Sequence, residues 1–242
     1  MGQLYIGTSG YTNKDWREKF YPKGVAQKDW LNFYAQHYNA VEINATFYRP
    51  FPASVYNKWR DSTPADFQFV LKGSQVITHE KILENVEAEL KDFVTNASVL
   101  GDKLGGMLWQ FPASVKAGGM RERLTAFLNL LPKNIQHTFE FRHESWFVED
   151  VYNLLNQFNA GLVINDSPKF PQREIITGPV MYVRFHGPDM LYESLYERDQ
   201  LAVWAERIKP KMDDYDVYLF FNNTTEGRAL DNANTIRDML KR

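Results

Sequence analysis

Short β-rich runs recur at intervals of roughly 25 to 40 residues along this chain, and amphipathic segments separate most of them. That alternation is typical of parallel strands joined by helices. The sequence predicts strands at residues 4–9, 40–46, 67–72, 106–111, 137–142, 161–165, 180–186 and 216–222. It predicts helices at residues 28–37, 54–61, 86–100, 120–130, 148–158, 199–212 and 232–240. Residues 167–173 carry two prolines and no helical period, which predicts an irregular connection after the sixth strand.

A closed (β/α)8 TIM-type barrel accounts for this pattern better than an open sheet. The chain has 242 residues, and α/β barrels of about 250 residues fold as one domain. A doubly wound open sheet is the alternative, but no glycine-rich dinucleotide turn follows a predicted strand. We therefore expect residues 1–242 to form a single barrel domain.

Charge and composition exclude several classes of protein. Lys and Arg number 28 against 30 Asp and Glu, so the net charge of -2 provides no overall attraction for nucleic acid, which is not favoured as a partner and could bind only through a local patch. The chain has no cysteine, which excludes disulfides and thiolate metal sites. No signal-peptide pattern and no long apolar run is present, so we expect a cytoplasmic protein without a membrane partner. The oligomeric state is left open, and a monomer is compatible with the sequence.

Strand periodicity separates an apolar face from a polar one. In the second strand, Val41 and Ile43 alternate with Glu42, and successive strand residues point to opposite faces. The apolar set is expected to face the helices. The same alternation in the third, fifth and seventh strands predicts a charged lumen that contains Glu42, Lys72, Glu140, Arg142, Arg184 and His186.

Other polar residues fall near the carboxyl ends of the remaining strands. Barrel active sites are built at that end, whereas an ordinary barrel interior is filled with branched apolar side chains. Internal ion pairs, Glu42 with Lys72 and Glu140 with an arginine, would be a purely structural alternative. The convergence of many polar groups favours a ligand site instead. The candidate substrate-binding residues are Thr8, Ser9, Asn44, Lys72, Gln110, Arg142, Asp166, Arg184, Asn222 and Asn223.

Several motifs across nearly the whole chain resemble one known family. They are IGTSGY at residues 6–11, VEINATFYR at 41–49, FVLK at 69–72, WQFP at 109–112, EFRH at 140–143, YVRFHG at 182–187 and FNN at 221–223. Together they are similar to the YecE-like family, the domain of unknown function seventy-two. The resemblance implies a TIM-type barrel and carries no settled activity. Tyr11 and Ala45 depart from the family pattern, and neither departure affects a charged position.

The lumen residues predict acid–base chemistry on a small anion. Lys72, Arg142 and Arg184 can surround a carboxylate or phosphate. Glu42 and Glu140 could face each other as acid and base, and His186 is the candidate proton shuttle. The sequence therefore predicts an enzyme, a hydrolase, lyase or isomerase, that acts on a small anionic molecule without a metal or another cofactor.

Two other functions remain open at this point. A metal-dependent barrel of the phosphodiesterase, endonuclease or sugar-isomerase kind would use Glu42, Glu140, Asp166 and His186 as ligands. The interleaved cations and the lack of HxH or HExxH spacing argue against it. A non-catalytic sensor would use the same pocket without turnover, and the types of residue present do not separate it from an enzyme.

Overall fold

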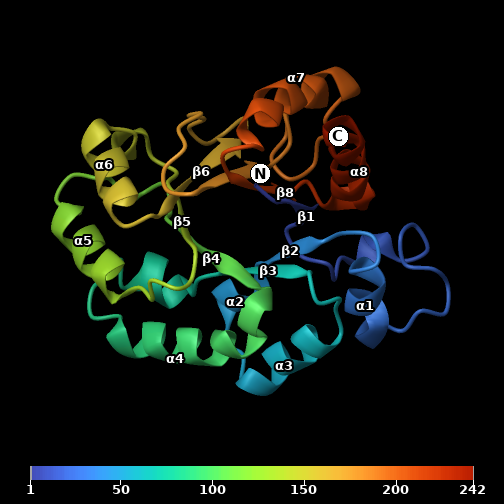
Figure 1. Ribbon diagram of the computed structural model, residues 1–242, viewed down its shortest axis with the longest axis horizontal. Coiled ribbons are helices and arrows are strands. Elements are labelled where there is room, and N and C mark those ends of the chain that lie inside the picture. Colours follow the sequence, from blue (N-terminus) through green and yellow to red (C-terminus); the bar gives the residue numbers. More distant parts are fainter. Residues whose placement is uncertain (1, 242) are drawn as a thin grey trace.

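Eight parallel strands curve into a nearly closed barrel that helices surround (Figure 1). The computed structural model describes residues 2–241, and the strand order is β1-β8-β7-β6-β5-β4-β3-β2. The strands are β1 Leu4–Thr8, β2 Ala40–Ile43, β3 Gln68–Lys72, β4 Leu104–Gln110, β5 His137–Glu140, β6 Gly161–Asp166, β7 Val180–Phe185 and β8 Asp216–Phe221. The helices are α1 Trp30–Tyr34, α2 Ala45–Tyr48, α3 Ala53–Asp61, α4 Glu87–Ala97, α5 Arg121–Leu130, α6 Glu149–Gln157, α7 Arg198–Ile208 and α8 Arg228–Leu240. The predicted fold class is confirmed.

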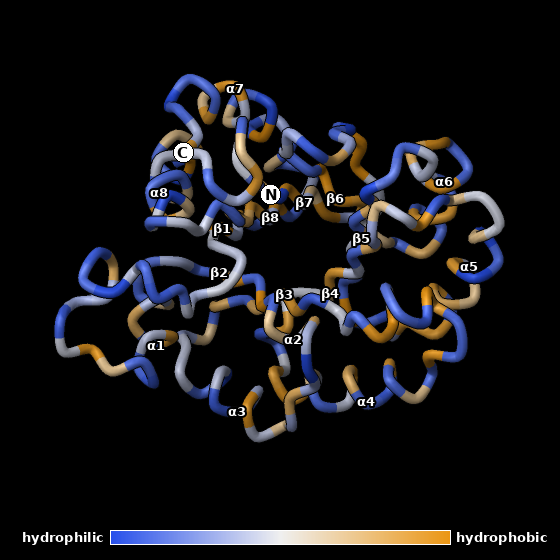
Figure 2. The backbone as a smooth tube through the Cα atoms, turned by 180° about the vertical axis from the view of Figure 1, so that it is seen from behind, coloured by the Kyte–Doolittle hydropathy of each residue, from blue (hydrophilic) through white to orange (hydrophobic). Residues whose placement is uncertain are grey.

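The barrel wall separates two apolar clusters. Strand residues such as Val41 and Phe69 pack outward with the helices in the larger cluster, as the alternation predicts. The smaller cluster lies inside the barrel and includes Val70, Tyr182 and Phe220. Hydrophobic colour follows several strands and recurs along the helices, while the connecting loops are mainly hydrophilic (Figure 2). Apolar side chains therefore share the lumen with a charged layer toward the carboxyl ends of the strands, which consists of Glu42, Lys72, Glu140, Arg142, Arg184 and His186.

Two connections decide the shape of the barrel mouth. The predicted strand over residues 40–46 ends at Ile43, because Asn44 is helical and Thr46 donates its hydroxyl to the carbonyls of Ile43 and Lys72. The short helix α2 therefore replaces the last predicted strand residues. Residues 167–179 form no helix, which confirms the predicted irregular connection between β6 and β7. Within residues 2–241, no helix has the length and apolar composition needed to cross a membrane.

Side chains rather than a backbone ladder close the barrel between β1 and β2. Across the described chain these strands share a single isolated bridge, Ser9 with Glu42. The Asn39 amide accepts from the Ile6 N–H at 2.9 Å and donates to the Leu4 carbonyl at 2.7 Å. The Tyr34 hydroxyl accepts from the Thr8 N–H at 2.8 Å and lies 3.2 Å from the Ala40 carbonyl, to which it donates.

Removing the Tyr34 hydroxyl should weaken this seam, the closure of the barrel between β1 and β2. In Tyr34→Phe the Thr8 N–H loses its acceptor inside the protein, and an unsatisfied buried donor costs about 1–3 kcal/mol. We expect the free energy of urea unfolding to fall by that amount. The matched control is Tyr48→Phe, because the Tyr48 side chain is largely exposed. Equal stability of the two variants would mean that Tyr34 does not carry the seam.

Candidate functional site

A buried arginine joins two strands on opposite sides of the lumen. The Arg184 guanidinium, on β7, donates to both Glu42 carboxylate oxygens at 3.0 and 2.7 Å. It also forms an ion pair with Glu140 of β5. All three side chains are at most 1% exposed. Such a buried triad is stable only when its hydrogen bonds are complete, because each unpaired charge would be costly in this environment.

The Glu42 carboxylate has further donors besides Arg184. The Ser9 hydroxyl donates to Oε1 and the Tyr182 hydroxyl to Oε2, both at 2.7 Å. With Arg184, this gives each Glu42 oxygen two donors. The carboxylate is therefore fully engaged, because each oxygen already accepts two hydrogen bonds.

Glu140 is held as an anion. The Arg142 Nε donates to its Oε1 at 2.6 Å, and Arg184 pairs with its Oε2. Burial alone would raise the pKa of Glu140, but Arg142 and Arg184 outweigh it and hold the pKa well below its usual range. A carboxyl group that stays ionised at neutral pH cannot serve there as a general acid. The geometry gives Glu140 the role of anchoring two arginines.

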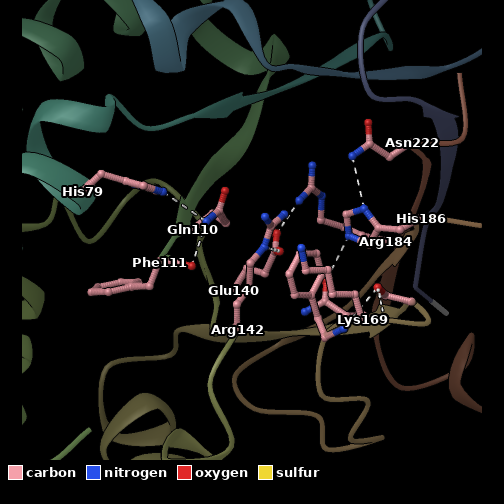
Figure 3. A network of polar contacts seen from close by, with 12 residues as sticks. His79, Gln110, Phe111, Glu140, Arg142, Lys169, Arg184, His186 and Asn222 are labelled. Carbon is pink, nitrogen blue, oxygen red and sulfur yellow. Dashed lines mark hydrogen bonds and ion pairs between the residues drawn. The ribbon is translucent and has the colours of Figure 1, made fainter. Parts of the chain in front are cut away.

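His186 lies in the same layer as a neutral ring with both nitrogens engaged (Figure 3). Its Nδ1 lies 3.2 Å from the Asn222 amide nitrogen, which donates to it, so Nε2 carries the proton and donates to the Asn165 Oδ1 at 3.1 Å. Burial, followed by Arg184, lowers the pKa of His186 well below its ordinary value. Amides accept no proton under these conditions, so this arrangement fixes the ring and leaves it without a partner for proton transfer.

Lys72 differs from the arginines around it. Lys72 is the last residue of β3, and its exposed fraction is only 7%. In the described chain, no carboxylate lies within ion-pair distance of its ammonium, and no hydrogen bond joins the ammonium to another group. The Phe47 ring lies 4.0 Å from Nζ. Burial, followed by the charge of Arg184, lowers the pKa of Lys72 to about 7. Lys72 is therefore a buried amine close to its titration midpoint at neutral pH.

Three buried amide atoms at this end of the barrel also lack partners. Oδ1 of Asn223, which follows β8, belongs to a side chain that donates to Ser194 and Asn232. The other two are Oδ1 of Asn44, which follows β2, and Nδ2 of Asn165, near the end of β6. Buried polar atoms in folded proteins are almost always hydrogen-bonded. One free acceptor and one free donor close to a charged layer are the pattern expected where a ligand completes the hydrogen bonding.

The connection between β6 and β7 covers the charged layer from outside. Phe170 packs on the Arg142 guanidinium at 4.0 Å and meets the His186 ring edge-on, with ring centroids 5.9 Å apart. Beside it is an open cleft of about 490 Å³, lined by Arg142, Lys169 and Arg173 among other residues. Arg142 therefore contacts both the buried carboxylate of Glu140 and a solvent-filled cleft.

Three predicted binding residues lie outside the lumen. The Thr8 hydroxyl contacts the Tyr34 hydroxyl and donates to the Gly10 carbonyl. Asp166 accepts from the Trp204 indole of α7, and the Asn223 amide donates to Ser194 and Asn232. In each case the adjacent residue, Ser9, Asn165 or Asn222, is the one that reaches the charged layer. Neighbouring strand residues point to opposite faces, so only one of each pair could do so.

The structure does not bring the four candidate metal ligands together. Glu42 and Glu140 are occupied by arginines, Asp166 points to α7, and both His186 nitrogens bond to amides. In residues 2–241, no group of three His, Asp or Glu side chains is arranged to hold a metal ion.

Three residues of the site were missed by the sequence analysis. Tyr182 has the same strand parity as Arg184, so periodicity could have identified it. His79 lies in the π-helical turn Val76–Glu80, where its Nε2 is 3.4 Å from the Gln110 amide (Figure 3). Burial, then Lys72 and Arg142, lower the pKa of His79 to about 4. His79 lies in a single helical turn and Phe170 in the irregular connection after β6, so neither belongs to a repeating sequence pattern that could have marked it.

Known proteins resemble this chain along its whole length. A family model described as "Protein of unknown function DUF72" matches residues 5–242. The UPF0759 protein YecE of Escherichia coli K12 is 27% identical over 99% of this chain and 93% of that protein. The UPF0759 protein YunF of Bacillus subtilis is 26% identical over 98% of this chain and 94% of that protein.

Solved structures support the same assignment. The crystal structure of a DUF72 family protein from Thermotoga maritima is 28% identical, with a TM-score of 0.86, and covers 99% of this chain and 100% of that one. A chitinase of family GH18 from Chromobacterium violaceum shares the fold alone, at 8% identity and a TM-score of 0.58, over 100% of this chain and 84% of that one. The chain with the Glu42–Arg184–Glu140 triad in its lumen belongs to the DUF72 family.

Proposed function

We propose that this protein is an enzyme that binds a small carboxylate or phosphate compound at the carboxyl ends of its strands and transfers protons on it. The observation that carries the proposal is the unpaired Lys72. Three cations, Lys72, Arg142 and Arg184, meet two carboxylates, Glu42 and Glu140, so a protonated Lys72 leaves one positive charge unbalanced. An anionic ligand would balance that charge, whose isolation in a buried site is otherwise unfavourable.

The surroundings of Lys72 support the same class of ligand. Arg142 lines both the charged layer and the outer cleft, so an anion entering from the cleft would meet its guanidinium first. Asn165 Nδ2 is a free donor for an oxygen of such a compound, and Asn44 Oδ1 is a free acceptor for a hydroxyl group. Together these groups suit an oxygen-rich anion.

The proton chemistry of Lys72 favours an enzyme over a passive sensor. Its pKa of about 7 is close to the value at which an acid–base catalyst works best at neutral pH. His79, whose pKa burial and the charge of Lys72 lower to about 4, is neutral at that pH and too weak a base to compete with Lys72 for a proton. A sensor needs only affinity, whereas a buried amine at its titration midpoint is characteristic of functional sites that carry protons.

Binding of an anion should stabilise the fold. When phosphate or malonate is present at about 100 times its dissociation constant, binding adds about 2.7 kcal/mol to the free energy of unfolding. In a chain of this size, each kcal/mol raises the Tm by roughly 2–4 °C. We expect thermal melts to rise by about 5–10 °C over chloride at the same ionic strength.

The variant Lys72→Met should remove that response, because Met keeps the length of the side chain but not its charge. The control is Lys91→Met, which changes an exposed lysine of α4 and should respond like the wild type. Identical responses to phosphate, malonate and chloride, or an undiminished response in Lys72→Met, would refute the anion site.

A further inference from the structure

We infer that Lys72 is a nucleophile that forms a covalent imine with a carbonyl group of the anionic compound. This inference rests on the proposed anion site for the substrate class, which becomes a small aldehyde or ketone with a carboxylate or phosphate group. It assigns to Lys72 a covalent role in addition to its charge.

The first observation is the contrast with another partly buried lysine. The ammonium of Lys103 donates to the carbonyls of Arg60 and Thr63 and to the Thr63 hydroxyl, so it serves as a structural cross-link. The Lys72 nitrogen has no such acceptor in the described chain, although its side chain is 7% exposed. A lysine without structural partners keeps its nitrogen available for reaction.

The second observation is the nature of the surrounding groups. Arg184 and Arg142 repel a charged ammonium, and the Phe47 ring covers it on one side at 4.0 Å. Burial beside other cations is one of the established ways in which proteins activate a lysine as a nucleophile. With a pKa of about 7, near half of Lys72 is neutral at pH 7, roughly a thousandfold more than for an ordinary lysine.

The step is balanced without an oxidant or reductant. The lone pair of the neutral Lys72 nitrogen attacks the carbonyl carbon, and the carbonyl π electrons move to the oxygen. After proton transfer the oxygen leaves as water, and a C=N bond forms to a nitrogen that keeps one hydrogen. The sum is amine plus carbonyl plus one proton from solvent, giving a protonated imine and water. This cation retains the contact with Phe47 and the attraction of Glu140.

Reductive trapping tests the inference on the full chain. The protein is incubated at pH 7 with glyoxylate, an anionic aldehyde, and sodium cyanoborohydride, and labelled lysines are located by peptide mass spectrometry. We expect label on Lys72 to form more than tenfold faster than on Lys103 or on the exposed lysines. The rate at Lys72 should reach half its maximum near pH 7, and acetaldehyde, which has no charge, should label it more slowly than glyoxylate does.

The conservative variant Lys72→Arg separates the two proposals. It keeps the positive charge, so phosphate should still raise the Tm, but it should lose the rapid label. If anions stabilise the wild type while Lys72 is labelled no faster than the exposed lysines, the nucleophile is refuted and the anion site stands. If Lys72 is labelled rapidly but glyoxylate has no advantage over acetaldehyde and phosphate does not stabilise, the nucleophile stands and the anion site fails. Both comparisons can be read from the wild type should the variant not fold.

Discussion

Replacing Arg184 with methionine should destabilise the protein by about 3–5 kcal/mol, the usual cost of leaving a buried charge without its partner. Methionine fills a similar volume but leaves the carboxylates of Glu42 and Glu140 without the cation that joins them. The expected fall in Tm is roughly 6–20 °C, from about 2–4 °C for each kcal/mol in a chain of this size. Urea unfolding followed by tryptophan fluorescence measures the free energy.

A compensated variant and a surface variant serve as controls. The double change Arg184→Met with Glu42→Gln removes the stranded charge of Glu42 and leaves Glu140 paired with Arg142, so it should recover most of the loss. Arg121→Met breaks only the exposed pair with Asp150, whose atoms are 3.7 Å apart, and should change stability by no more than about 1 kcal/mol. If Arg184→Met were as stable as Arg121→Met, the triad would not be the structural centre of the lumen.

Acid should destabilise this protein from about pH 6.5 downward, because its buried histidines resist protonation. Burial lowers the pKa of His137 to about 4, and burial followed by Arg184 lowers that of His186 well below 6.5. Below about pH 6.5 these histidines therefore bind protons in the unfolded chain but stay neutral in the folded chain. The free energy of unfolding falls as the pH falls. Each buried histidine contributes a slope of about 1.4 kcal/mol per pH unit, or about 5 kcal/mol for the two between pH 6.5 and 4.5.

Urea unfolding at several pH values between 7 and 4.5 measures this slope. His137→Gln keeps an acceptor for the Trp109 indole and a donor for the Pro132 carbonyl, so it should fold and lose one histidine's share of the slope. His37→Gln alters an exposed histidine and should leave the slope unchanged. A free energy of unfolding that is constant between pH 7 and pH 5 would contradict the burial of neutral His137 and His186.

Strand periodicity was enough to predict most of the charged layer. Because successive strand residues point to opposite faces, Glu42, Glu140 and Arg184 could be assigned to the lumen from local sequence. The same rule excludes Thr8 as a neighbour of Glu42 once Ser9 occupies that face. Both Asn222 and Asn223 were predicted to bind the substrate, but two adjacent strand residues cannot both point into the lumen.

The roles of these residues depended on contacts across the barrel. Glu42 and Glu140 were proposed as an acid and a base, but Arg184 lies between them and both carboxylates serve as its partners. The number of residues between two strands does not give the distance between their side chains across the lumen. The pairing of Arg184 with both carboxylates could therefore not be derived from the sequence. His186 was proposed as a proton shuttle, and only the positions of two amides show that its ring is fixed as a neutral group.

The sequence by itself determined the eight-fold alternation of strands and helices, the irregular connection after β6 and the polar face of each strand, because these follow from local periodicity and from proline. Only the tertiary structure decided which polar groups are satisfied. Arg142 and Arg184 form ion pairs with carboxylates. Lys72, the last residue of β3, contacts the Phe47 ring and has no hydrogen-bond acceptor in the described chain. Hydrogen bonding and charge balance in a closed lumen depend on all strands at once, and no segment of sequence carries that information alone.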